Sequence, residues 1–143
     1  MHIACSNNNV KLIEFLLKHE GKIIEEKSPN FDKHLLFGIT NGEKQTCLHY
    51  ACRYDSYDAV KFLADIYKQS KDSDHSKILE AKDYQERTPF FLACEYGNTE
   101  IVKLLLELGA KVEIKNKNGQ KALYWIISKC PDIVNVFNCL NDF

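Results

Sequence analysis

The sequence predicts an all-α protein, a solenoid of about four helix-turn-helix units that carries two loop insertions. Three observations indicate this fold. A short apolar segment with a small residue at its centre recurs along the chain, a second apolar run follows each copy, and helix-ending signals flank the best copy. A helix pair of this size cannot bury its apolar face alone, so neighbouring units must stack on one another.

The recurring segment occupies residues 1–5, 48–52 and 90–94, and a weaker copy occupies residues 123–126. The second apolar runs cover residues 10–17, 60–63, 101–108 and 133–137. Each pair has the length and spacing of two short helices joined by a turn. We therefore expect one domain over residues 1–143, with units at about 1–40, 41–82, 83–115 and 116–143.

Residues 83–115 form the most complete copy. The Thr88 hydroxyl is placed to cap a first helix, and Pro89 suits the first helical position, where no amide partner is lost. Gly97 falls in the predicted turn, and Gly109 is placed to end the second helix in the left-handed conformation. A small residue recurs in the first helix and allows close helix approach: Ala4, Ala51 and Ala93.

These features resemble the ankyrin-repeat family. Its repeat has a Thr-Pro-Leu-His start, a small residue two positions later, a Gly turn and a Leu-rich second helix. Residues 83–115 look like a full copy of 33 residues, and the resemblance covers nearly the whole chain. It implies an ankyrin-repeat solenoid that binds another protein and is not an enzyme.

The spacing between copies predicts where extra residues lie. Ala4 and Ala51 are 47 residues apart, and Ala51 and Ala93 are 42 apart. Relative to a 33-residue unit these spacings contain about 14 and 9 extra residues, which we expect in loops near 21–40 and 69–77. The first insertion contains Phe31, Leu35, Leu36 and Phe37, which predict a short packed helical turn, whereas the second is polar throughout.

Composition excludes several function classes. The 19 basic and 20 acidic residues leave a net charge of −1, which gives no electrostatic case for nucleic acid or an anionic membrane. We see no apolar run long enough to span a bilayer and no secretory signal, so we expect a cytoplasmic segment, although a longer parent protein could be membrane-bound. No phosphate loop, nucleophile elbow or paired Cys-x-x-Cys is present, so no enzyme activity and no cofactor are expected.

The six cysteines have two interpretations each. Cys5, Cys52 and Cys94 occupy one repeat position, where stacked helices lie too far apart for disulfides, and we interpret them as small buried hydrophobes. Cys47, His49 and Cys52 have side chains of the kinds that bind zinc, but all three fall inside the repeat motif. In the family that the chain resembles, the His of this motif forms a hydrogen bond with the backbone of a neighbouring repeat. We therefore expect no metal site.

Two further cysteines flank the last helical run. Cys130 and Cys139 are candidates for exposed thiols, and Lys129 is the sequence neighbour that could activate one of them.

Surface recognition remains as the predicted function. In ankyrin arrays the partner contacts a concave strip made of loop tips and the polar ends of the first helices. Tyr and Arg dominate binding hot spots, so the stacked pair Tyr54 and Tyr96, with Arg53 and Arg87 nearby, is the expected contact centre. Carried over by position, the strip comprises Glu43, Gln45, Arg53, Tyr54, Tyr84, Gln85, Arg87, Glu95, Tyr96, Lys117, Gln120 and Lys129.

Two alternatives stay open beside a recognition module for one protein partner. Residues 122–142 look like the last repeats of the ankyrin-subfamily transient receptor potential channels, which implies a cytosolic channel arm that serves gating or subunit assembly. An ankyrin-bearing effector from a pathogen or virus is a third hypothesis. Met1 occupies the Leu position of the motif, so we expect a piece of a longer array. Partner identity and oligomeric state stay open.

Overall fold

The chain folds as two rows of stacked helices. The computed structural model describes residues 1–27, 38–69 and 76–133, and within these ranges the secondary structure is helical apart from one isolated bridge between Lys115 and Lys121. The helices are α1 (His2–Ser6), α2 (Val10–Lys27), α3 (Cys47–Arg53), α4 (Tyr57–Gln69), α5 (Ser76–Leu79), α6 (Pro89–Tyr96), α7 (Thr99–Glu107) and α8 (Ala122–Lys129). This architecture confirms the predicted all-α solenoid.

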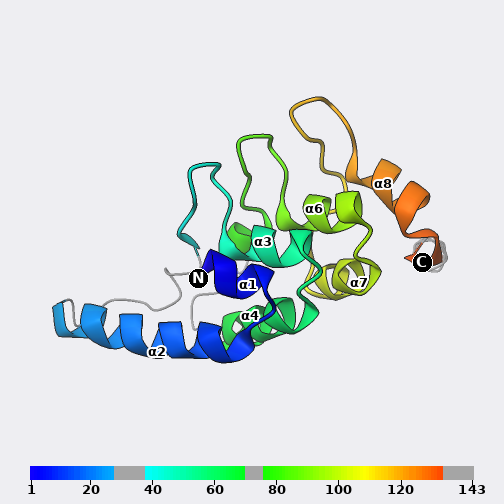
Figure 1. Ribbon diagram of the computed structural model, residues 1–143. Coiled ribbons are helices and arrows are strands. Elements are labelled where there is room, and N and C mark those ends of the chain that lie inside the picture. Colours follow the sequence, from blue (N-terminus) through cyan, green and yellow to red (C-terminus); the bar gives the residue numbers. More distant parts are fainter. Residues whose placement is uncertain (28–37, 70–75, 134–143) are drawn as a thin grey trace.

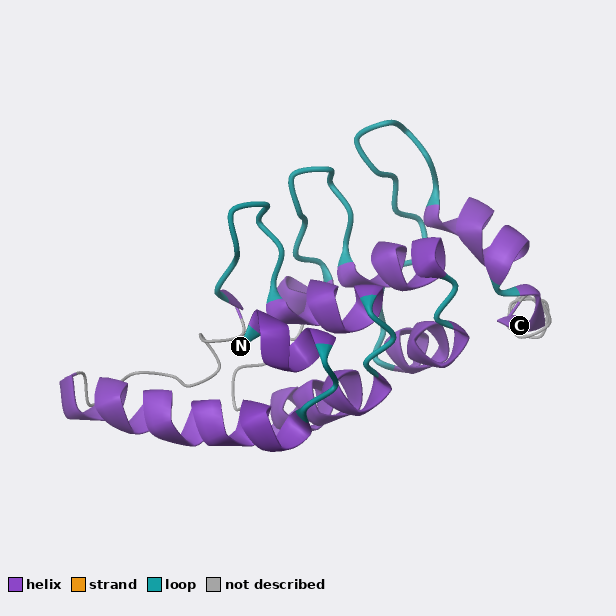
Figure 2. Cartoon of the chain, viewed as in Figure 1, coloured by secondary structure: helices purple, strands orange, loops and turns teal. Residues whose placement is uncertain are grey.

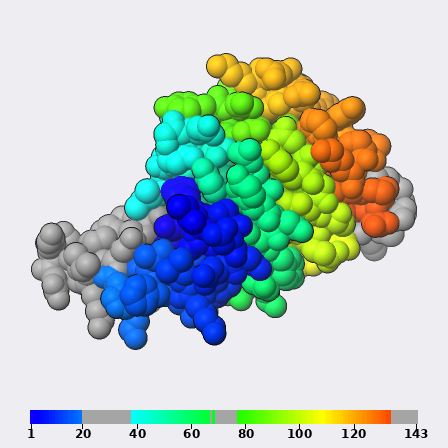
Figure 3. Space-filling model, in the orientation of Figure 1, coloured from blue at the N-terminus to red at the C-terminus, as the bar shows by residue number. Residues whose placement is uncertain are grey.

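Stacking follows the repeat (Figure 1). Helices α1, α3, α6 and α8 pack side by side in one row, and α2, α4 and α7 pack in a second row beneath them. Three long loops project from the same side of the first row, before α3, α6 and α8 (Figure 2). In the space-filling view the pairs form consecutive bands across the molecule (Figure 3).

One continuous core joins the helix pairs. The equivalent Ala4, Ala51 and Ala93 are at most 2% exposed, which lets the first-row helices pack closely. In the second row, apolar residues spaced three or four apart face this core, such as Val60, Leu63 and Ala64 in α4. The predicted signals of the best copy are confirmed: the Thr88 hydroxyl accepts a hydrogen bond from Phe91 N–H, and Gly97 and Gly109 have φ of 79° and 86°.

The first insertion does not begin where the sequence indicated. Residues 21–27 belong to α2, which runs for 18 residues, whereas a loop from Gly21 was expected. The segment that follows Gly21 is rich in Lys, Glu and Ile, and a single Gly costs a helix only about 1 kcal/mol, so the helix continues through it. In the second insertion Gln69 ends α4 and Ser76 begins α5. The predicted packed turn at Phe31 to Phe37 and residues 70–75 lie outside the described residues.

The three loops share one strained position. Lys44, Glu86 and Gly119 occupy equivalent places and have φ of 58°, 60° and 76°. Only glycine adopts this left-handed backbone without a steric cost. A Cβ added at Gly119 would meet nothing within 4 Å, so its substitution tests the backbone conformation alone.

We expect Glu86→Gly to stabilise the fold by about 0.5–1 kcal/mol, and Gly119→Ala to destabilise it by about 1 kcal/mol. Urea unfolding followed by circular dichroism measures both. Gly42→Ala, at a loop position without positive φ, is the matched control. A Gly119→Ala variant as stable as the wild type would contradict the assignment of strain.

Candidate functional site: the loop tips and the concave strip

Each loop is closed by the side chain of its first residue. The Oδ1 atom of Asn41 accepts hydrogen bonds from the N–H groups of Glu43 and Gln45, both at 2.9 Å. Asp83 Oδ1 makes the same two bonds to residues 85 and 87, and Asn116 Oδ1 makes them to residues 118 and 120. Asn and Asp favour such turns because their short side chains reach the backbone two residues on.

Consecutive loops are joined through their backbones. Tyr84 N–H donates to the Glu43 carbonyl at 3.1 Å, and Lys117 N–H donates to the Gln85 carbonyl at 2.8 Å. The two bonds use the same positions in successive loops, so the tips stand in register side by side.

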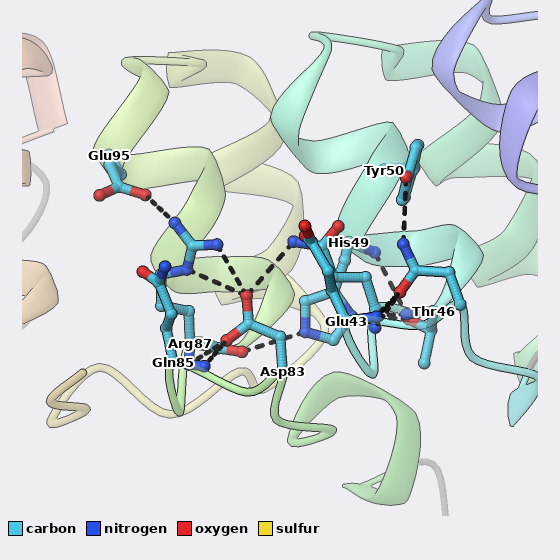
Figure 4. A network of polar contacts seen from close by, with 10 residues as sticks. Glu43, Thr46, His49, Tyr50, Asp83, Gln85, Arg87 and Glu95 are labelled. Carbon is cyan, nitrogen blue, oxygen red and sulfur yellow. Dashed lines mark hydrogen bonds and ion pairs between the residues drawn. The ribbon is translucent and has the colours of Figure 1, made fainter. Parts of the chain in front are cut away.

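His49 ties two neighbouring helix pairs together (Figure 4). Thr46 N–H donates to His49 Nδ1 at 3.1 Å, so Nδ1 is the acceptor and Nε2 carries the proton that is donated to the Arg87 carbonyl at 3.0 Å. His2 makes the equivalent contact to the Gln45 carbonyl at 2.9 Å. This confirms the predicted bond between the repeat His and neighbouring backbone. Burial lowers the pKa of His49, and the hydrogen bond to the Arg87 carbonyl opposes that shift in part.

Asp83 and Arg87 form a buried ion pair beside His49 (Figure 4). Arg87 Nη2 and Nε lie 2.8 and 3.0 Å from Asp83 Oδ2, and Arg87 Nη1 lies 3.0 Å from Glu95 Oε2. Burial alone would raise the pKa of Asp83, but hydrogen bonds from Arg87 and Gln45 outweigh it, and the pKa lies below its usual value. All three polar nitrogens of this guanidinium are therefore used within the fold.

Two residues of the predicted strip serve the fold instead of its surface. Gln45 is 1% exposed, its amide donates to Asp83 Oδ2 at 3.3 Å, and a buried side chain cannot contact a partner. The Arg87 side chain is 12% exposed and paired with two carboxylates, so it does not belong to an exposed contact centre. Both residues were predicted from their position in the repeat. The carboxylate that Gln45 contacts, that of Asp83, lies on the next loop, so the repeat position of Gln45 does not indicate this contact.

The expected contact centre comes together around Arg53. Its guanidinium carbon lies 5.5 Å from the ring centroid of Tyr54 and 5.5 Å from that of Tyr96, so the cation stands between two aromatic side chains from neighbouring helix pairs. Tyr54 is 53% and Tyr96 44% exposed. Tyr50 extends this aromatic group, with its ring 6.0 Å from Tyr54.

The remaining strip residues line the loop tips and the last helix. Lys129 Nζ donates to the Glu95 carbonyl at 2.6 Å and lies 5.0 Å from the Trp125 ring. Gln120 Oε1 accepts from Asn116 Nδ2 at 2.7 Å. The side chains that the structure leaves exposed are Glu43, Tyr84, Gln85, Lys117, Gln120 and Lys129, and Glu95 is half-buried.

Sequence reasoning missed two members of this surface. Lys44 Nζ lies 5.0 Å from the ring centroid of Tyr84, and Trp125 lies beneath Lys129. Lys44 follows the predicted Glu43 directly, but its contact crosses from one loop to the next, so no spacing within a unit indicates it.

The five cysteines among the described residues are interior. Cys5, Cys52 and Cys94 are fully buried, as predicted, and burial raises the pKa of the Cys52 and Cys94 thiols. The prediction that Cys130 is exposed is wrong: its exposure is 0% because the end of α8 turns it toward Ile133 and the core. Cys139 lies outside the described residues. Over residues 1–27, 38–69 and 76–133 no group of three metal-ligating side chains comes together.

Comparison with known proteins agrees with this geometry. A family model described as ankyrin repeats in three copies matches residues 1–74 and 69–139. The chain belongs to the ankyrin-repeat family. Helices α1 with α2, α3 with α4, and α6 with α7 are thus successive ankyrin repeats, and α8 is the first helix of the next.

The relatives are larger proteins. Transient receptor potential cation channel subfamily A member 1 of Drosophila melanogaster is 27% identical over 89% of this chain, and the match covers 9% of that protein. A putative ankyrin repeat protein of Rickettsia felis is 28% identical over 85% of the chain and 32% of its own length. Glycerophosphocholine phosphodiesterase GDE1 of Eremothecium gossypii is 28% identical over 83% of the chain and 8% of its own length. The chain thus spans less than a third of each.

In the described part of the chain, no helix has the length and apolar character that crossing a membrane requires.

We expect stability to fall as the pH drops from 7 to 5, because of His49. Its pKa is lower in the folded state than its unfolded value of about 6.5, so the unfolded state binds more protons in this window. The contribution of neutral His49 to the free energy of unfolding is fully present above about pH 6.5. It is lost as the pH falls, by at most about 1.4 kcal/mol per pH unit. Urea unfolding at several pH values measures it.

The matched variant is His49→Phe, because Phe91 fills the equivalent position of the next repeat. It should be less stable at pH 7 and show a smaller slope between pH 7 and 5. If that variant does not fold, NMR titration of the wild-type ring decides the point, and a folded pKa at or above about 6.5 contradicts the prediction.

Asp83 has two separable functions, closing its loop and pairing with Arg87. Asp83→Asn keeps an oxygen for the loop, as in Asn41 and Asn116, but removes the charge, and we expect a loss of about 2 kcal/mol or more. Asp83→Ala also removes the loop acceptor and should cost about 1–2 kcal/mol beyond that. Chemical unfolding gives both values. Glu95→Gln, at the more exposed end, is the control, and Asp83→Asn should cost clearly more than it.

Proposed function

We propose that this segment is a protein-recognition module that binds one partner through its concave strip. The observation that carries the proposal is the group formed by Arg53, Tyr54 and Tyr96, in which a cation and two half-exposed rings from adjacent repeats converge. Such aromatic and Arg side chains supply most of the energy in protein interfaces. The loops and stacked helices hold the strip rigid, which lowers the entropic cost of binding.

The proposal also places this segment within a longer array of repeats. We propose four units, at about 1–40, 41–82, 83–115 and 116–143, with a further repeat packed on the first. Ile3 is 73% and Leu12 39% exposed, whereas their counterparts Leu92 and Ile101 are fully buried against a preceding repeat. Cross-links from Lys11 to residues outside this segment in the full-length protein would support it, and their absence would oppose it.

A channel arm is the second candidate. It is favoured by the similarity to transient receptor potential cation channel subfamily A member 1 of Drosophila melanogaster and of Homo sapiens, the latter 31% identical over 71% of the chain and 8% of that protein. In either case we propose a cytoplasmic location, consistent with buried thiols at Cys5, Cys52 and Cys94. Affinity purification and mass spectrometry of the full-length protein, with this segment present or deleted, separates the two. A soluble partner lost on deletion supports recognition, whereas recovery of the parent's own subunits alone supports the arm.

We expect Tyr54→Ala combined with Tyr96→Ala to weaken binding to a partner so identified by at least tenfold, because truncation of interface aromatics typically costs about 2 kcal/mol or more. The fold should remain, since both rings are about half exposed. Titration calorimetry measures the affinity. Tyr57→Ala, at a tyrosine 37% exposed at the start of α4, is the control. Wild-type affinity in the double variant would refute the strip assignment.

A further inference from the structure

Arg53 differs from the other arginine of the strip in what its guanidinium contacts. Arg87 directs its nitrogens at Asp83 and Glu95. Arg53 contacts the rings of Tyr54 and Tyr96, and no hydrogen-bond acceptor for its N–H groups is found among the described residues. Because Arg53 is only half-buried and its donors make no such bond, its N–H groups are available to a ligand.

The ionic surroundings of Arg53 are unbalanced. Arg87 pairs with both Asp83 and Glu95, so these three side chains together have a net charge of −1. The remaining exposed charges of the strip are Lys117 and Lys129 against Glu43. With Arg53 and Asp83 included, four basic and three acidic side chains leave this surface an excess of one positive charge, although the whole chain has a net charge of −1.

We propose that Arg53, held between Tyr54 and Tyr96, is a binding site for a carboxylate of the protein partner. This inference rests on the proposed function and specifies the chemistry of the ligand. The guanidinium edge donates two parallel hydrogen bonds to the carboxylate oxygens, and the rings restrict the side chain so that little rotamer entropy is lost on binding. The partner segment is thus acidic, and it supplies either an Asp or Glu side chain or a C-terminal carboxylate.

A carboxylate fits this site better than a phosphate group. A phosphate dianion is typically bound by a cluster of arginines, whereas here one guanidinium stands between two tyrosine rings. One positive charge balances the single negative charge of a carboxylate.

The test is an NMR titration of the 143-residue chain, followed at the backbone amides of residues 53, 54 and 96 in every variant and also at the Arg53 Nε–Hε resonance in the wild type. The probes are an acetylated, C-terminally amidated peptide of alternating Glu and Ala, its Gln analogue, the Gln analogue with a free C-terminal carboxylate, and a phosphoserine analogue. We expect the Glu peptide or the free-carboxylate peptide to bind, and this choice identifies the source of the carboxylate. Arg53→Gln should weaken that binding about tenfold, and Arg53→Lys about threefold because it keeps the charge and loses the planar pair of donors.

Lys61→Gln is the matched control, since Lys61 is an exposed basic residue of α4 and lies outside the strip. It should leave the affinity within about twofold. Unchanged urea midpoints for all variants show that the fold is kept.

Three results would overturn the inference: binding of the amidated Gln peptide as tight as that of both carboxylate peptides, an effect of Arg53→Gln no larger than that of Lys61→Gln, or binding of the phosphoserine peptide alone. The proposed function is judged separately by the Tyr54→Ala and Tyr96→Ala double variant against the identified partner. If the double variant no longer binds the partner but Arg53→Gln still does, the recognition module is supported and the carboxylate site is refuted.

Discussion

The hydrogen bonds between consecutive loops set the register on which the rest of the structure depends. Tyr84 N–H donates to the Glu43 carbonyl, and Lys117 N–H donates to the Gln85 carbonyl. The donors occupy one position of the loop and the acceptors another in both cases. Those positions are fixed in advance by the side chains of Asn41, Asp83 and Asn116, which hold the loop backbones in one conformation. A displacement by one residue would separate these donors and acceptors, and both hydrogen bonds would be lost.

Register at the loops determines what meets in the rows of helices. Because each repeat is displaced from the last by the same step, equivalent alanines face one another and the first-row helices approach closely. Equivalent positions at the ends of α3 and α6 likewise bring Tyr54 and Tyr96 to either side of Arg53. The surface group is therefore a consequence of stacking, and neither repeat contains it alone.

The second repeat is joined to the third by polar contacts inside the fold. His49 donates a hydrogen bond to the Arg87 carbonyl, and the Asp83 carboxylate accepts hydrogen bonds from the side chains of Gln45 and Arg87. Gln45 Oε1 is buried without a hydrogen-bond partner in the described part of the chain, so this network is not fully satisfied. Such partly satisfied networks add less to stability than an apolar contact would, but their geometry admits one arrangement of the two repeats.

The repeat, its helix pairs and the residues that end them can be predicted from the amino-acid sequence alone. These depend on local signals, such as the Thr88 cap, the positive φ of Gly97 and Gly109, and the apolar spacing in the second-row helices. The sequence also identified the buried cysteines by their shared position. Which polar residues remain on the surface depends instead on the packing of the repeats. Gln45 is buried against Asp83, 38 residues along the chain, and Arg53 lies between rings from two repeats, so no local pattern encodes either contact. Arg87 is paired within its own repeat, but its position in the motif alone does not show that its charge is used there.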